Sequence, residues 1–200
     1  MLRVGITGGI AAGKSTLSRY LSAKGFAVID ADLVSRELVS PGSKAARQLA
    51  EVFGNDFFDD CGQLKRREMG DLVFNDPAAL EKLNAIMFPL IWENIEDEIA
   101  RLARENPGLP LVFVDAALLL ESGGLAHVDR VWLVVCEDEI RLRRLMDRDG
   151  LTQSQAESRM GAQWSQGEKE AFADSILRSD QGEEALFAQA ERLLRLLALD

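Results

Sequence analysis

The sequence predicts a three-layer α/β fold in which a parallel sheet of five strands lies between helices. Two observations carry this prediction. Short segments that are apolar throughout alternate with longer amphipathic or charged segments along the 200 residues. Strands of that kind are typical of a parallel sheet whose two faces are both covered. The first apolar segment also runs directly into a glycine-rich turn that is followed by a helix-like segment.

The first part of the expected core covers residues 1–42. Residues 2–7 are apolar and β-branched and stop at two glycines, so we expect a buried strand there. After the glycine-rich turn, a helix, a strand and a second helix are expected over 14–23, 26–30 and 33–38.

The core is expected to resume in residues 106–137 and to finish in residues 173–200. A third strand lies within 109–121, and the last two strands and the closing helix are expected over 129–136, 173–177 and 183–199. The leucines of that helix recur at helical spacing, which indicates core packing.

Two helical segments interrupt this core. Residues 43–105 are mainly helical and are punctuated by Pro77 and Pro89, and residues 138–172 are charged and poor in strand signals. Ligands of parallel sheets bind beyond the carboxyl ends of the strands. We therefore expect 43–105 to be a helical insertion on the substrate side and 138–172 to be a helical lid.

Bulk composition indicates one globular domain over residues 1–200. The hydrophobic fraction is 47%, and no apolar run approaches the roughly 20 residues of a membrane span. No secretory signal is visible, and two scattered cysteines form neither a disulfide framework nor a zinc site. A cytoplasmic protein with no membrane attachment is expected.

The formal net charge of −10 argues against a protein that attracts nucleic acid over a broad surface. It does not argue against a small anionic substrate, because such a ligand responds to a local loop, a metal ion and a few arginines. We expect small-molecule substrates and no obligate protein partner.

The glycine-rich turn has the spacing of a phosphate-binding loop, Gly8-x₄-Gly13-Lys14-Ser15, between a strand and a helix. Small residues let successive N–H groups point inward, and the helix start adds positive potential. Lys14 is expected to reach the β- and γ-phosphates, and the Ser15 hydroxyl to bind Mg²⁺. The ATP-binding set in the loop is Gly8, Gly9, Ile10, Ala11, Ala12, Gly13, Lys14, Ser15 and Thr16.

Carboxylates follow two of the expected strands. Asp32 comes just after the second strand, where it can accept a hydroxyl proton and orient that oxygen toward the γ-phosphate. The alternative is that Asp32 caps the following helix. Asp115 ends the third strand and is placed like a second Mg²⁺-organising acid, although a turn residue is an equal alternative.

Arginines gather at the start of the expected lid. Arg144 and Arg148 are four residues apart and therefore share one helix face, with Arg141 adjacent. Guanidinium groups there can neutralise charge that develops on a transferring phosphate. The alternative is a solvated helix face. Arg36, one turn after Asp32, is expected either to hold an acceptor phosphate or to face solvent.

Several segments together resemble the dephospho-coenzyme A kinase family from end to end of the chain. They are the phosphate loop, "VIDADLVSREL", "LLLE" at 118–121, "RLRRLMDRDGLT" and "ESRMGAQWSQGEKEAFAD". The resemblance implies transfer of the ATP γ-phosphate to the ribose 3′-hydroxyl of dephospho-coenzyme A, with Mg²⁺ and ATP required, on a P-loop kinase fold. It implies that Asp32, Lys14 and Arg144 are catalytic, that Arg144 and Arg148 bind ATP, and that Asp32, Arg36, Leu118 and Glu121 bind the acceptor.

The chain departs from the family pattern at several positions. Ala11-Ala12 replace the usual Gly-Ser, Phe88 precedes Pro89 in place of His, and Ala117 replaces a Pro. Arg141 replaces a Gln at the start of the lid, and Ser179 replaces an Asn after the fifth strand. The last two bear on lid closure and on contact with adenine.

Two other functions are compatible with the phosphate loop. One is a different P-loop kinase that acts on a nucleoside monophosphate or a small alcohol. The other is a nucleotide-hydrolysing switch protein, but the chain has no guanine-reading Asn-Lys-x-Asp.

Overall fold

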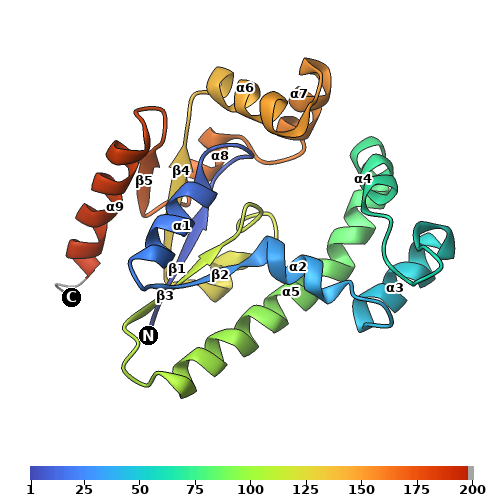
Figure 1. Ribbon diagram of the computed structural model, residues 1–200, viewed down its shortest axis with the longest axis horizontal. Coiled ribbons are helices and arrows are strands. Elements are labelled where there is room, and N and C mark those ends of the chain that lie inside the picture. The colour runs from blue at the N-terminus through green and yellow to red at the C-terminus, as the bar shows by residue number, and fades with distance from the viewer. Residues whose placement is uncertain (198–200) are drawn as a thin grey trace. The chain divides into compact units, whose positions relative to one another are not determined.

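The computed structural model describes residues 1–197 and confirms the predicted fold class. Five parallel strands form one sheet in the order β2-β3-β1-β4-β5, with helices flanking it (Figure 1). The strands span Leu2–Thr7, Ala27–Asp30, Leu111–Asp115, Arg130–Val135 and Ser175–Arg178 for β1 to β5. The chain divides into two compact units, residues 1–29 with 108–200 and residues 30–107, which are described separately.

In the first unit, β1 lies at the centre of the sheet because it pairs with both β3 and β4. Ile6 is in register with Asp115 of β3 and with Trp132 of β4. Strands β1, β3 and β4 are buried over most of their length, as expected for a parallel sheet covered on both faces. This register brings the carboxyl ends of β1, β3 and β4 to the same edge.

Two helices of the first unit, α1 (Lys14–Ala23) and α9 (Glu183–Leu197), lie side by side and pack on one face of the sheet (Figure 1). The rings of Tyr20 and Phe187 stack with centroids 4.1 Å apart. The leucine pattern of the closing helix therefore serves core packing, as predicted. The helix was expected to continue to 199, and residues 198 and 199 lie outside the described residues.

Three helices follow β4 in the expected lid, α6 (Asp138–Asp149), α7 (Gln153–Gly161) and α8 (Gln166–Glu170). Figure 1 shows α6 and α7 beyond the carboxyl end of β4. Helices α7 and α8 each begin with a capping box, formed by Thr152 with Gln155 and by Ser165 with Glu168. Reciprocal caps of this kind fix where a short helix begins.

The second unit is helical. It contains α2 (Ala31–Leu38), α3 (Lys44–Phe53), the 3₁₀ turn η1 (Asn55–Phe57), α4 (Arg66–Asn75) and α5 (Pro77–Glu105). By contacts this unit begins at Asp30 rather than at residue 43, so α2 belongs with it. Pro77 starts α5, but Pro89 does not interrupt it. A proline inside a helix removes one backbone hydrogen bond, and apolar packing of neighbours such as Leu90 compensates.

No helix within residues 1–197 is both long enough and apolar enough to cross a membrane.

The short 3₁₀ turn η2 (Gly124–His127) completes the first unit between β3 and β4.

Candidate active site

The phosphate loop closely contacts the strand beside it. Gly8 has a φ of 152°, and a Cβ there would lie 2.3 Å from the carbonyl oxygen of Val134 in β4. Gly13 precedes α1 with a φ of 97°, and no side chain caps the helix. The first N–H groups of α1 are therefore free of a side-chain acceptor and can hold an anion.

A tight turn lies in the middle of this loop. The Ala12 N–H donates to the Gly9 carbonyl oxygen at 3.0 Å, so Ile10 and Ala11 are the two central residues of a four-residue turn. Ala11 has a φ of 61° and is the sole non-glycine residue with positive φ among residues 1–197. The backbone of the loop is thus held in a conformation that alanine adopts only at a cost.

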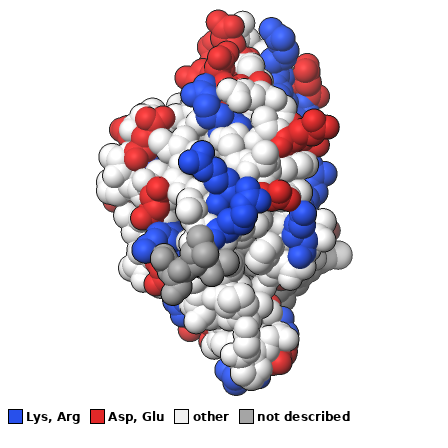
Figure 2. Space-filling model, turned by 90° about the vertical axis from the view of Figure 1, so that its left-hand side faces the viewer, with Lys and Arg blue, Asp and Glu red and all other residues white. Residues whose placement is uncertain are grey.

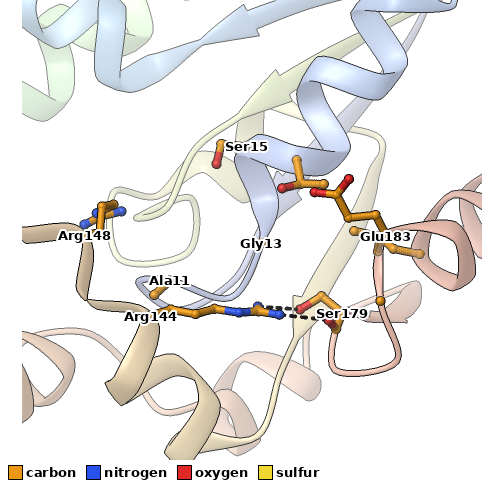
Figure 3. A pocket seen from close by; sticks show the side chains of 10 residues that line it. Ala11, Gly13, Ser15, Arg144, Arg148, Ser179 and Glu183 are labelled. Atoms are coloured by element: carbon orange, nitrogen blue, oxygen red, sulfur yellow. Dashed lines mark hydrogen bonds between the residues drawn. The ribbon is translucent and has the colours of Figure 1, made fainter. Parts of the chain in front are cut away.

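A pocket of about 270 Å³ opens at the end of the loop (Figure 3). Loop residues and the start of α1 line one side, and α6, the end of β5 and α9 supply the rest. Figure 3 shows the Arg144 side chain reaching from the lid toward Ser179, next to Ala11. The lining residues are Ala11, Gly13, Ser15, Thr16, Arg144, Arg148, Ser179, Gly182, Glu183 and Leu186.

The two lid arginines are held in different ways. Arg144 donates to the Ser179 hydroxyl at 3.3 Å and to its carbonyl oxygen at 3.2 Å. Arg148 donates through Nε to Asp149 at 2.7 Å, and this ion pair lowers the pKa of the Asp149 carboxyl. Both arginines line the pocket, together with one carboxylate, that of Glu183.

The negative net charge of the chain is not spread evenly over its surface. In the face seen from the α9 side, Lys and Arg side chains gather near the centre, with Asp and Glu side chains around them (Figure 2). An anionic ligand responds to such local charge.

Ser15 and Asp115 both lie by α1. Ser15 is exposed in the first turn of the helix and lines the pocket. Ser18, one turn later on the same face, donates to the Asp115 carboxylate at 2.6 Å. Asp115 is thus held against α1. Within the described chain, no group of three or more His, Cys, Asp or Glu side chains could hold a metal ion by itself.

Comparison with known proteins decides the family. A family model described as dephospho-CoA kinase matches residues 2–184. A dephospho-CoA kinase of Geobacter sulfurreducens is 40% identical over 190 residues, which is 95% of each chain. One from Geobacillus kaustophilus is 41% identical and covers 90% of this chain and 88% of that protein.

The chain belongs to the dephospho-CoA kinase family.

Solved structures agree. The dephospho-CoA kinase of Campylobacter jejuni has a TM-score of 0.69, 25% identity and coverage of 96% of this chain and 95% of that one. The structure of TT1252 from Thermus thermophilus has a TM-score of 0.83 and is 30% identical in sequence. The match covers 98% of this chain and 96% of that one. A shikimate kinase from Aquifex aeolicus, 16% identical with a TM-score of 0.53, shares the fold, and it covers 98% of this chain and 96% of that one.

The acceptor-side residues that the dephospho-CoA kinase resemblance implies lie in both units. Asp32 and Arg36 are exposed on α2 in the second unit. The suggestion that Asp32 caps this helix is wrong, because Asp30 does so by accepting from the N–H groups of Asp32 and Leu33 at 2.8 and 3.0 Å. The Asp32 carboxylate is not used as a cap. Leu118 is half-buried in the turn after β3.

Glu121 is part of a buried ion pair that sequence reasoning missed. Lys169 of α8 is fully buried and donates to the Ala117 carbonyl oxygen at 2.8 Å, with Glu121 also 2.8 Å away. Burial lowers the pKa of Lys169, Glu121 opposes this shift, and the positive charges of Lys14 and Arg141 add to it. The ion pair therefore lies close to the catalytic lysine that the family resemblance implies.

Two departures from the family pattern fall at the phosphate loop. The Ser179 hydroxyl donates to the Ala12 carbonyl oxygen at 2.6 Å, so it holds the backbone of the loop. The Arg141 side chain is buried and lies across Gly9, where a Cβ would be 2.1 Å from its Nη2 atom. Arg141 donates a hydrogen bond to the Ile10 carbonyl oxygen, and the Ile10 N–H donates to the Gln163 side chain. No local signal in the sequence marks Gln163 as a residue of the site.

Proposed function

We propose that this chain transfers the γ-phosphate of ATP to the 3′-hydroxyl of the ribose of dephospho-CoA, giving CoA and ADP. The observation that carries this proposal is the match to dephospho-CoA kinases over nearly the whole of both chains. A phosphate loop and an arginine-lined pocket at the carboxyl end of the sheet support the nucleotide half of the reaction.

In this proposal, the loop from Gly8 to Thr16 and the uncapped start of α1 hold the phosphates of ATP. Lys14 neutralises charge that develops on the γ-phosphate, and Arg144 and Arg148 contribute from the lid. Fixed positive groups of this kind stabilise a phosphoryl transition state without reorganising. Closure of the 138–172 lid excludes water, which would otherwise compete with the acceptor.

We further propose that Mg²⁺ accompanies ATP. Magnesium is usually bound by one or two protein groups, with phosphate oxygens and water completing its shell. We assign this role to the Ser15 hydroxyl, in the first turn of α1, and to the Asp115 carboxylate, which accepts from Ser18 of the same helix. When bound, the ion neutralises charge on the phosphates.

On the acceptor side, Asp32 receives the proton of the ribose hydroxyl and orients its oxygen. Arg36, Leu118 and Glu121, together with the helical segment 43–105, are proposed to bind dephospho-CoA. Glu121 acts there indirectly, because its carboxylate is already paired with Lys169. A cytoplasmic location and the lack of an obligate protein partner stay predictions from the sequence.

An acceptor panel tests the proposal. ADP release from Mg²⁺-ATP is followed with dephospho-CoA, adenosine, AMP, CMP, shikimate and gluconate as candidate acceptors. We expect turnover with dephospho-CoA alone. Turnover with another acceptor would retain the kinase chemistry and reject this substrate, and hydrolysis without acceptor preference would favour a switch protein.

A further inference from the structure

The turn in the phosphate loop has two possible backbone arrangements. With Ile10 and Ala11 as its central residues, a positive φ at Ala11 makes it a type II turn, which normally has glycine at that position. The same four residues could close a type I turn, in which Ala11 would have negative φ and no strain. The two arrangements differ mainly by a flip of the peptide group between Ile10 and Ala11, because ψ of the first residue and φ of the second both change by about 150–170°.

Two side chains from the lid segment hold that peptide group and the one before it. Arg141 Nε donates to the Ile10 carbonyl oxygen at 3.1 Å, and the Ile10 N–H donates to the Gln163 amide oxygen at 2.8 Å. The carbonyl that would turn away in a type I turn is therefore the one that Arg141 binds.

The position of Arg141 is itself fixed. Its Nη1 donates to the Asp138 carboxylate at 2.7 Å, and Gln166 donates to the same oxygen at 3.1 Å. The side chain is 6% exposed and lies across Gly9. A buried guanidinium with this many contacts can hold a backbone carbonyl in one orientation.

We propose that Arg141 and Gln163 are positioning residues that clamp Ile10 and thereby keep Ala11 in the left-handed conformation that the nucleotide-binding loop needs. This inference rests on the proposed binding of nucleotide at the loop. Without the clamp, the loop relaxes toward the unstrained type I turn. Only the fraction of molecules whose loop keeps the type II turn then binds nucleotide. Apparent affinity falls in proportion to that fraction.

A double-mutant cycle tests the clamp. The dissociation constant of a non-hydrolysable ATP analogue with Mg²⁺ is measured by calorimetry for the wild type, Arg141→Met, Ala11→Gly and the double variant. Because relaxation of an alanine out of this conformation is favoured by a few multiples of RT, Arg141→Met should weaken binding about tenfold. In the Ala11→Gly background the same change should cost about threefold or less, since glycine adopts positive φ readily.

Gln163→Leu provides a second test that changes no charge and removes no buried cation. We expect Gln163→Leu to weaken analogue binding and Ala11→Gly to restore most of the lost affinity. In the steady-state assay, the KM for ATP should rise while kcat at saturating ATP stays nearly unchanged. Gln153→Leu, in the same lid segment but bonded to Glu157, is the matched control and should bind the analogue like the wild type.

An equal loss of analogue affinity on Arg141→Met in the wild type and in the Ala11→Gly variant would overturn the clamp. Such a result would mean that affinity falls through lost charge or lost stability, which glycine at position 11 does not restore. Wild-type affinity in both Arg141→Met and Gln163→Leu would overturn it as well. Analogue binding needs no acceptor, so a failure of dephospho-CoA as substrate would reject the proposed function and leave this test intact.

Discussion

Lys169 and Glu121 form a buried ion pair that joins α8 to the turn after β3. The ammonium nitrogen lies 2.8 Å from the carboxylate, and the lysine side chain has no exposed surface. The Trp164 N–H donates to the same carboxylate at 3.1 Å. This pair links the end of the expected lid segment to the segment that carries Leu118.

Lys169→Met should destabilise the protein strongly. It leaves the Glu121 carboxylate, 13% exposed, without its cation, and breaking one side of a buried pair costs about 3–5 kcal/mol. The double variant Lys169→Met/Glu121→Gln should recover most of that loss, because a neutral amide still accepts from Trp164. Urea unfolding measures both values. A double variant no more stable than the single one would show that the pair is not the cause.

The pH dependence of stability should differ between wild type and Lys169→Met. Burial places the pKa of Lys169 below its ordinary value in the folded chain, whereas the unfolded chain titrates near about 10.4. Between these two values the unfolded chain binds more protons, so the free energy of unfolding rises with pH. The stability of the wild type relative to Lys169→Met should therefore rise with pH over the interval that ends at the unfolded-state value of about 10.4. A constant or falling difference would mean that burial does not dominate.

Lys14→Ala should reduce turnover by about 10²- to 10⁴-fold, because lost stabilisation of transition-state charge is worth about 3–5 kcal/mol. The assay is ADP release at saturating substrates. Lys24→Ala is the matched control, since Lys24 ends the same helix in an exposed pair with Glu191. Near-normal turnover of Lys14→Ala would remove the lysine from the mechanism.

Asp32→Asn should lower turnover with dephospho-CoA while leaving affinity for ATP nearly intact, since the carboxylate acts on the acceptor hydroxyl. Asp30→Asn is the control. It retains an oxygen that caps α2 and should keep turnover. Calorimetry with an ATP analogue checks binding. If Asp32→Asn abolished ATP binding, the role proposed for Asp32 would be wrong.

The elements that the sequence predicts well are those with strong local signals. Strand β1, the phosphate loop and α1 follow from an apolar run, two glycines and helical spacing, and α1 begins at Lys14 as expected. The closing helix follows from its leucines. Such signals depend on neighbours along the chain, so one sequence is enough to detect them.

Features that depend on distant partners could not be predicted. Lys169 lies in a charged segment, which normally indicates solvent, and its buried partners Ala117 and Glu121 are 52 and 48 residues away along the chain. Capping of α2 by Asp32 was only an alternative in the sequence, and Asp30 forms the cap, since two neighbouring aspartates precede this helix and local signals do not distinguish them. Pro89 stays inside α5 because apolar packing outweighs one lost hydrogen bond.

The most direct test of the central claim is the position of the transferred phosphate. The product formed from Mg²⁺-ATP and dephospho-CoA is examined by ³¹P NMR and by mass. We predict one new phosphomonoester, coupled to the ribose 3′-proton, and stoichiometric ADP. Phosphate on another oxygen, or ADP formed with unmodified dephospho-CoA, would contradict the proposed reaction.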